Sequence, residues 1–246
     1  GASKLLSEKI LYSFYKKIYK EKEKHMILTY HGHSCFKLKG KLGTVVVDPF
    51  SSSVGFSMPN LSADIVTISH DNSSHNNSSA VSGTSRRKKP FVVNNLGEYE
   101  VGGISVFGVK SAQVSKDAEE EKRENRIFTI IIDGIRVCHL GELGHELTAE
   151  TIKEIGAVDI LLVPVGGVYT INAKQAVAAV KSLEPGYVVP MHFKTSAHDA
   201  GKFGELQELS EFVKEFGAEK VETVDKLKVE KDRLPEEKEL VIIERT

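Results

Sequence analysis

Tryptophan is absent from this sequence of 246 residues, and only two cysteines occur, Cys35 and Cys138. Two cysteines cannot form the disulfide framework that many small secreted domains need, so we expect a reducing compartment, the cytoplasm. No apolar run is long enough to cross a bilayer and no secretory signal precedes the first strand-like segment, so we expect no membrane partner. The net charge of −1 gives no reason to expect a nucleic acid as partner.

The composition is that of a globular protein. Hydrophobic residues make up 40% of the chain and charged residues 27%, both ordinary values for a folded domain. A chain of this length can bury the core of one large domain or of two small ones. We expect one main domain over residues 26–246.

Residues 1–25 differ in charge from the rest of the chain, with seven lysines against three glutamates. Apolar residues recur there every four positions, which predicts an amphipathic helix; they are Leu6, Ile10, Phe14 and Ile18. This stripe can pack on the domain or on a second copy, which would give a homo-oligomer, or it can lie on a membrane surface. The segment can also derive from the expression vector, because Gly1-Ala2-Ser3 looks like a cleavage scar.

Strand-like segments dominate the first half of the chain. Short β-rich runs bounded by turn-forming residues predict strands at residues 26–30, 34–38, 44–48, 63–69, 91–94, 99–101 and 104–109. Residues 115–126 are almost wholly charged and predict a solvated loop. Two apolar runs flank Asp133-Gly134, which is the strongest hairpin signal in the sequence.

The second half alternates between helix and strand. Thr148 predicts the N-terminal cap of a helix that runs to about Ile155. Further helices are expected at residues 173–183 and 203–216, and strands at 159–163, 187–189, 226–229 and 239–244. A mixed sheet followed by βα units favours a layered α/β architecture.

Residues able to bind a metal or transfer a proton follow several of these strands. In α/β folds such positions meet at one end of the sheet and form sites. The candidates are His31, His33, Asp48, His70, His75, Glu142, His145 and His192.

Six short motifs carry most of these residues in one order: Tyr30-His31-Gly32-His33-Ser34, Asp48-Pro49-Phe50, Ile68-Ser69-His70-Asp71, Gly97-Glu98-Tyr99-Glu100-Val101, Gly141-Glu142-Leu143-Gly144-His145 and Pro190-Met191-His192-Phe193. Over residues 26–246 this order resembles the metallo-β-lactamase superfamily, and within it the branch of zinc-dependent hydrolases that includes L-ascorbate-6-phosphate lactonase. The resemblance implies an α/β fold, a four-layer αββα sandwich, which the N-terminal helical extension would precede. It also implies a zinc-dependent hydrolase with a small-molecule substrate.

The metal motif of that family, H-x-H-x-D-H followed by a distant His, an Asp and a last His, is incomplete in this sequence. Imidazoles and carboxylates at this spacing hold Zn²⁺ with an open position for water, and the metal lowers the pKa of water to about 7. Four positions retain a metal-binding side chain: His70, His75, Glu142 (in place of the Asp) and His192. Three positions have lost theirs: Asn72, Ser74 and, on a looser alignment, Gln113.

The losses fall mainly on one of the family's two metal subsites. We therefore expect one metal or none, on His75, Glu142 and His192, with zinc first and iron or manganese as alternatives. Asp48 and His33 are expected to orient the ligands without binding the metal themselves. His31 is expected to be structural or at the rim of the cleft, and His145 to make local hydrogen bonds.

Two functions remain open. The first is a metal-dependent hydrolase of a small ester, lactone or phosphodiester. The second is a catalytically silent relative that keeps the fold for binding or assembly. Asn72 and Ser74 separate the two, because an enzyme of the usual type would not have lost both ligands.

Overall fold

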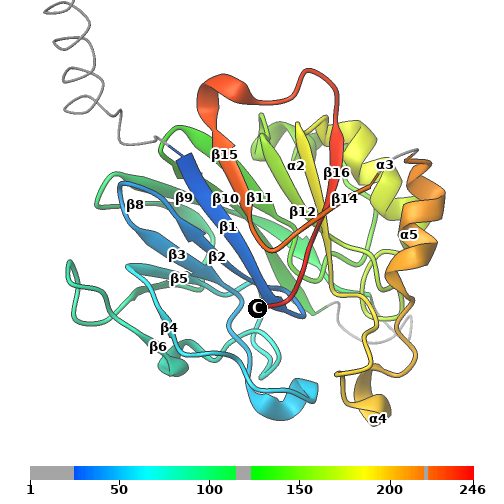
Figure 1. Cartoon of the computed structure of the whole chain (residues 1–246), viewed down its shortest axis with the longest axis horizontal. Coiled ribbons are helices and arrows are strands. Elements are labelled where there is room, and N and C mark those ends of the chain that lie inside the picture. Colours follow the sequence, from blue (N-terminus) through cyan, green and yellow to red (C-terminus); the bar gives the residue numbers. More distant parts are fainter. Residues whose placement is uncertain (1–24, 115–122, 219–220) are drawn as a thin grey trace, which may run out of the picture.

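Two β-sheets packed face to face form the centre of the computed structural model, which describes residues 25–114, 123–218 and 221–246 (Figure 1). A further small sheet pairs β4 (Leu61–Ser62) with β6 (Val81–Ser82). The arrangement confirms the expected α/β sandwich. The helix predicted in residues 1–25 lies, except for His25, outside the described residues, so the helix and the oligomer that it would form stay predictions.

The six-stranded sheet has the order β15-β1-β2-β3-β5-β7. Its strands are β1 (His25–Gly32), β2 (Cys35–Lys39), β3 (Thr44–Val47), β5 (Ile65–Thr67), β7 (Phe91–Val93) and β15 (Leu227–Glu230). Strands β1, β2 and β3 pair antiparallel, whereas β3, β5 and β7 run parallel. Strands β3 and β5 therefore end at the same edge of the sheet, just before Asp48 and His70.

The eight-stranded sheet has the order β14-β16-β13-β12-β11-β10-β9-β8. Its strands are β8 (Gly97–Val101), β9 (Ile104–Ala112), β10 (Glu124–Ile132), β11 (Ile135–His139), β12 (Ile160–Pro164), β13 (Tyr187–Met191), β14 (Glu222–Val224) and β16 (Glu239–Ile243). Strands β8 to β11 form an antiparallel meander, and β11, β12, β13 and β16 run parallel.

The hairpin predicted at Asp133-Gly134 is confirmed. Ile132 pairs with Ile135 across the turn, and the two turn residues have positive φ angles of 51° and 79°, as a two-residue hairpin loop requires. The prediction of a loop as far as residue 126 is wrong, because β10 begins at Glu124. Pairing with β9 and burial of alternate side chains outweigh the charged composition at this point.

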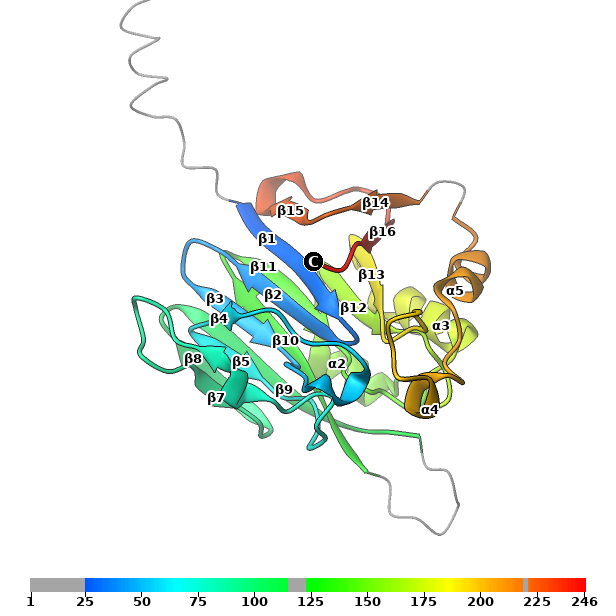
Figure 2. The same ribbon diagram turned by 60° about the horizontal axis from the view of Figure 1, so that its bottom comes forward.

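Three helices pack against the eight-stranded sheet: α2 (Ala149–Ile155), α3 (Ala173–Leu183) and α5 (Leu209–Phe216) (Figures 1 and 2). Thr148 caps α2 as predicted, with its Oγ1 accepting a hydrogen bond from Thr151 N at 3.1 Å. The prediction of one helix over residues 203–216 is wrong. The short helix α4 (Ala200–Phe203) ends there, and the chain before α5 instead forms an isolated β-bridge between Lys194 and Glu208. No helix of the described residues is long and apolar enough to span a membrane.

The core lies mainly between the two sheets, and β3 shows how both of its layers are filled. Val45 and Val47 belong to the cluster between the sheets, whereas Val46 packs on the outer face with Phe50 and Phe203. Burial of an apolar side chain of this size stabilises the fold by about 1.5–3 kcal/mol. Because both faces of β3 are covered, a continuous apolar run forms a strand. The outer face of the six-stranded sheet is thus covered by the loop after β3 and by α4.

Candidate metal centre

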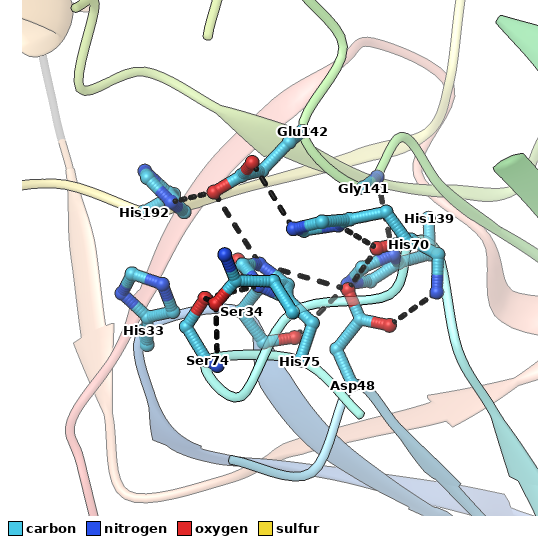
Figure 3. A network of polar contacts seen from close by, with 12 residues as sticks. His33, Ser34, Asp48, His70, Ser74, His75, His139, Gly141, Glu142 and His192 are labelled. Atoms are coloured by element: carbon cyan, nitrogen blue, oxygen red, sulfur yellow. Dashed lines mark hydrogen bonds and ion pairs between the residues drawn. The ribbon is translucent and has the colours of Figure 1, made fainter. Parts of the chain in front are cut away.

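The candidate residues from both sheets meet at one edge of the sandwich (Figure 3). Asp48 and His70 follow β3 and β5 of the six-stranded sheet, while Glu142 and His192 follow β11 and β13 of the eight-stranded sheet. Because parallel strands bring their carboxyl ends to the same edge, residues distant in sequence become neighbours. His192 Nε2 lies 3.0 Å from Glu142 Oε1, and His70 Nε2 lies 3.1 Å from Glu142 Oε2.

His33 joins this group from the turn between β1 and β2. Its carbonyl oxygen accepts hydrogen bonds from His192 N at 2.8 Å and from Tyr30 Oη at 2.9 Å, so the turn is fastened to the end of β13. His33, Asp48 and His192 all have positive φ angles, between 44° and 55°. This left-handed conformation is uncommon for residues other than glycine, and such backbone strain concentrates at functional sites.

Four side chains each place one potential ligand atom within 4.8 Å of the others. They are His33, His75, Glu142 and His192, all of them buried. Glu142 is central, because its Oε1 lies 3.0 Å from His192 Nε2 and 3.9 Å from His75 Nε2. Three imidazoles and one carboxylate form a donor set that suits zinc and iron.

The expected ligand set and the group of four differ at His33 and His70. His33, expected behind the ligands, belongs to the group of four. His70, expected as a ligand, is outside this group, but its Nε2 lies 3.1 Å from Glu142 Oε2, so its role as a ligand stays a prediction. The backbone hydrogen bond from His192 N to His33 O, at 2.8 Å, fixes the β1–β2 turn beside the site.

The protonation states suit metal binding. Burial lowers the pKa of His33 and of His75 well below the usual value, and it lowers the pKa of His70 as well. Burial alone would raise the pKa of Glu142, but interactions with the neighbouring histidines and with Arg123 outweigh it and lower this pKa. At neutral pH these residues therefore offer neutral imidazoles and an ionised carboxylate, the forms that bind metals.

Three buried nitrogens of the site, His33 Nε2, His70 Nε2 and His192 Nδ1, have no hydrogen-bond partner among the described residues. The contact of His70 with Glu142 has the distance of an ion pair without the geometry of a hydrogen bond. The other ring nitrogen of His33, Nδ1, lies 3.3 Å from His198 Nε2, which leaves Nε2 as the available ligand atom. A buried polar atom without a partner costs free energy, so the residues present fit one divalent metal.

Asn72, Ser74 and Gln113, the three positions at which the family motif would have a metal ligand, also lie at the site. Asn72 Oδ1 accepts hydrogen bonds from Ser74 N at 3.0 Å and from Ser74 Oγ at 2.9 Å. Ser74 Oγ lies 3.0 Å from His75 Nδ1. Asn72 and Ser74 thus orient His75, and Gln113 lines the same cavity as both of them.

Asp48 lies behind the histidines, in a position from which it can orient them. Its carboxylate accepts hydrogen bonds from Ser69 N at 2.8 Å and from Ser69 Oγ at 2.5 Å. Its Oδ2 also lies 3.9 Å from the Nε2 atoms of His75 and His139. Burial raises the pKa of Asp48 to about 8, so the group carries a proton over much of the neutral range.

Asn125, which the sequence patterns did not single out, fixes the turn that carries Glu142. Its Oδ1 accepts a hydrogen bond from Glu142 N at 2.9 Å, and its Nδ2 donates to Leu140 O at 3.0 Å. Between these residues Gly141 has a φ of 61°, and a Cβ there would lie 2.3 Å from Asn125 Oδ1. The only signal in the sequence is a polar amide placed two positions before the apolar run of β10.

The remaining histidines of the motifs make structural contacts, as expected. His31 Nδ1 lies 3.1 Å from Thr246 Oγ1, and His145 Nε2 accepts a hydrogen bond from Ala112 N at 3.2 Å. His198 lies outside the six motifs, and its Nε2 lies 3.3 Å from His33 Nδ1.

Two stacked mixed sheets with histidines and a carboxylate at one edge define a sandwich of the metallo-β-lactamase type. Residues 27–192 match the model of a family described as the β-lactamase superfamily domain, and the chain belongs to this family.

Several similar proteins are described as metal-dependent hydrolases. The chain is 31% identical over 191 residues to a UPF0173 metal-dependent hydrolase from Methanoculleus marisnigri, which covers 69% of this chain and 82% of the relative. It is 27% identical over 189 residues to one from Thermoplasma volcanium, with 68% and 83% covered.

Solved structures agree with this assignment. A Thermotoga maritima protein assigned to the Zn-dependent hydrolases of the metallo-β-lactamase superfamily is 35% identical and has a TM-score of 0.71, covering 89% of this chain and 98% of its own. A metallo hydrolase from Ignicoccus hospitalis, 22% identical with a TM-score of 0.56, covers 78% of this chain and 90% of its own and shares the fold.

Proposed function

We propose that this chain is a metal-dependent hydrolase of a small ester, lactone or phosphodiester and that it works with a single metal. The observation that carries the proposal is the convergence of His33, His75, Glu142 and His192, whose ligand atoms lie within 4.8 Å of one another. The metal-dependent hydrolases among its relatives support the reaction class. A divalent metal held there would act as a Lewis acid, polarising the scissile carbonyl or phosphoryl group and lowering the pKa of water.

The chain's own residues hold this centre in place. Asn125 Oδ1 accepts a hydrogen bond from Glu142 N at 2.9 Å. His70 Nε2 lies 3.1 Å from Oε2 of the Glu142 carboxylate. Ser74 Oγ, at 3.0 Å, orients the ring of His75. The side-chain hydrogen bonds thus fix two ligands before any metal arrives, which is the preorganisation that metal sites require.

Ser74 also limits the rate. In the family motif this position carries a carboxylate, whereas here the hydroxyl donates its hydrogen bond to Asn72 at 2.9 Å. The site therefore has no carboxylate at position 74 to orient an attacking water. Loss of one preorganised group of this kind costs about 10²–10³ in rate, so we expect slow turnover.

Zinc is the metal that we propose first, with iron or manganese as alternatives, because imidazole-rich sites suit zinc and iron.

The buried and unpaired Cys35 and Cys138 support a reducing compartment such as the cytoplasm.

A panel of neutral esters, lactones and phosphodiesters, each supplied with zinc, manganese or iron, tests the proposal. Turnover by the natural chain should exceed that of a Glu142→Gln variant at least tenfold, since the variant lacks the only carboxylate of the ligand group. Equal rates for the two proteins with every metal would refute the hydrolase.

One observation favours a second candidate, a silent relative that serves in binding or assembly. The hydrogen bonds between Asn72 and Ser74 are complete without a metal or a substrate. Metal binding in the absence of any turnover on the panel would support this candidate.

A further inference from the structure

A cavity of about 320 Å³ opens beside the candidate metal centre. Hydroxyl and amide groups line much of it, on Ser53, Ser73, Ser74, Tyr169, Asn72 and Gln113. Glu142 is the single carboxylate among the described residues of its wall. A substrate in this cavity would therefore reach the metal ligands through a lining rich in hydrogen-bond donors.

Two cations, Arg123 and Lys202, also line the cavity. Neither forms an ion pair with a described carboxylate. Arg123 is close enough to Glu142 to be among the groups that lower its pKa against the effect of burial. Within the described part of the chain, no carboxylate therefore competes in an ion pair with a ligand for these two charges.

Lys202 is held at the cavity by its surroundings. Its backbone N donates to Asp199 Oδ1 at 2.9 Å, and its carbonyl accepts from Tyr169 Oη at 2.8 Å. Its Nζ reaches the Ser53 carbonyl at 3.4 Å. Asp199 N in turn donates to Val54 O at 2.8 Å, which ties α4 to the loop after β3. Contacts made by α4 and by the loop after β3 therefore position the ammonium group of Lys202.

The charge of the cavity selects its ligand. Among the described residues of the wall, the two cations Arg123 and Lys202 exceed the one anion, Glu142, by a charge of +1. A divalent metal bound by neutral imidazoles would raise this excess to +3, although the whole chain has a net charge of −1. A concave site with one sign of charge concentrates ligands of the opposite sign. Oxyanions also accept the hydrogen bonds that arginine, lysine and hydroxyl groups offer.

We infer that the substrate carries an oxyanion, a phosphate or a carboxylate, that binds to Arg123 and Lys202 while its ester bond lies at the metal centre. The inference rests on the proposed function for the reaction but not for the binding of the anion. It makes Arg123 and Lys202 specificity-determining residues of the cavity.

Binding and turnover test the inference separately. Inorganic phosphate and succinate are titrated by calorimetry at low salt into the natural chain and into Arg123→Gln, Lys202→Gln and the double variant. A second double variant, Arg87→Gln with Lys181→Gln, is the control, because it removes the same charge from exposed residues that do not line the cavity. Each single variant should weaken the preferred anion about tenfold, equivalent to about 1.4 kcal/mol, and the control should bind as the natural chain does. The anion that binds more tightly identifies phosphate or carboxylate as the source of the charge.

The kinetic arm compares two esters with the same leaving group, 4-nitrophenyl acetate and the mono-4-nitrophenyl ester of succinic acid. The Arg123→Gln, Lys202→Gln double variant should raise KM for the succinate ester at least tenfold more than KM for the acetate ester, whereas the Arg87→Gln, Lys181→Gln control should change neither. Anion affinity and KM that are equal in the natural chain and the double variant would overturn the inference. Anion binding that depends on both cations, without turnover of either ester, would support the inference and refute the hydrolase instead.

Discussion

His33 and His70 can be compared directly, because the family motif assigns the metal to His70 whereas the structure groups His33 with the ligands. We consider His33→Asn and His70→Asn, measured for zinc affinity against a chromogenic chelator. Asparagine suits both positions, since it removes the imidazole and also tolerates the φ of 54° at residue 33. Both histidines are nearly fully buried, so each change removes a similar amount of packing.

The two variants should lose zinc affinity to different extents. Structural zinc sites bind with about 10–16 kcal/mol, or about 2.5–4 kcal/mol for each of four ligands, so loss of His33 should weaken zinc binding about 60- to 700-fold. Loss of His70, which only supports the far oxygen of Glu142 at 3.1 Å, should cost about 10- to 100-fold. Thermal melts of the metal-free variants control for folding. A His70→Asn variant that loses zinc while His33→Asn retains it would refute the reasoning.

Three further predictions follow from the same contacts. In the metal-free chain, His139 alone should contribute a fall of about 3 kcal/mol in the free energy of unfolding as pH drops from 6.5 to about 4, because burial lowers its pKa from 6.5 to about 4 and the unfolded state takes up the proton first. Denaturant titrations should show a flatter profile for His139→Gln than for the natural chain, and an equal slope would contradict the assignment. Combining Asn72→His, Ser74→Asp and Gln113→His should raise the zinc content toward two per chain, since these changes restore the ligands of the family motif; a content that stays at one in elemental analysis would show that the backbone no longer fits a second metal. Gly141→Ala should lower the melting temperature and the zinc affinity together, because a Cβ at a φ of 61° would lie 2.3 Å from Asn125 Oδ1; Gly102→Ala, which also has a positive φ but meets nothing within 4 Å, is the control and should leave zinc affinity unchanged.

Sequence patterns predicted the parts of the fold that local chemistry determines. The Asp133-Gly134 hairpin and the Thr148 cap depend on residues within one turn, and both are present. The helix predicted over residues 203–216 depended on apolar spacing alone. It fails because the chain before Leu209 makes hydrogen bonds to other segments, such as that from Gln207 N to Gly166 O at 2.8 Å.

The site was predictable only in part. The motif residues Glu142 and His192 were recognisable because their order along the chain matches that of a family. The position of His33 depends on a backbone contact with His192 from a distant strand, and no local pattern contains that information. The same holds for Lys202, an exposed lysine like many others until α4 places it at the cavity.

The central claim is one metal per chain, held by His33, His75, Glu142 and His192. Elemental analysis of the purified chain, loaded with zinc and then freed of excess metal, tests it most directly, with Glu142→Gln as the control. We expect one zinc ion per natural chain and much less in the control. Two zinc ions per chain, or none, would contradict the account.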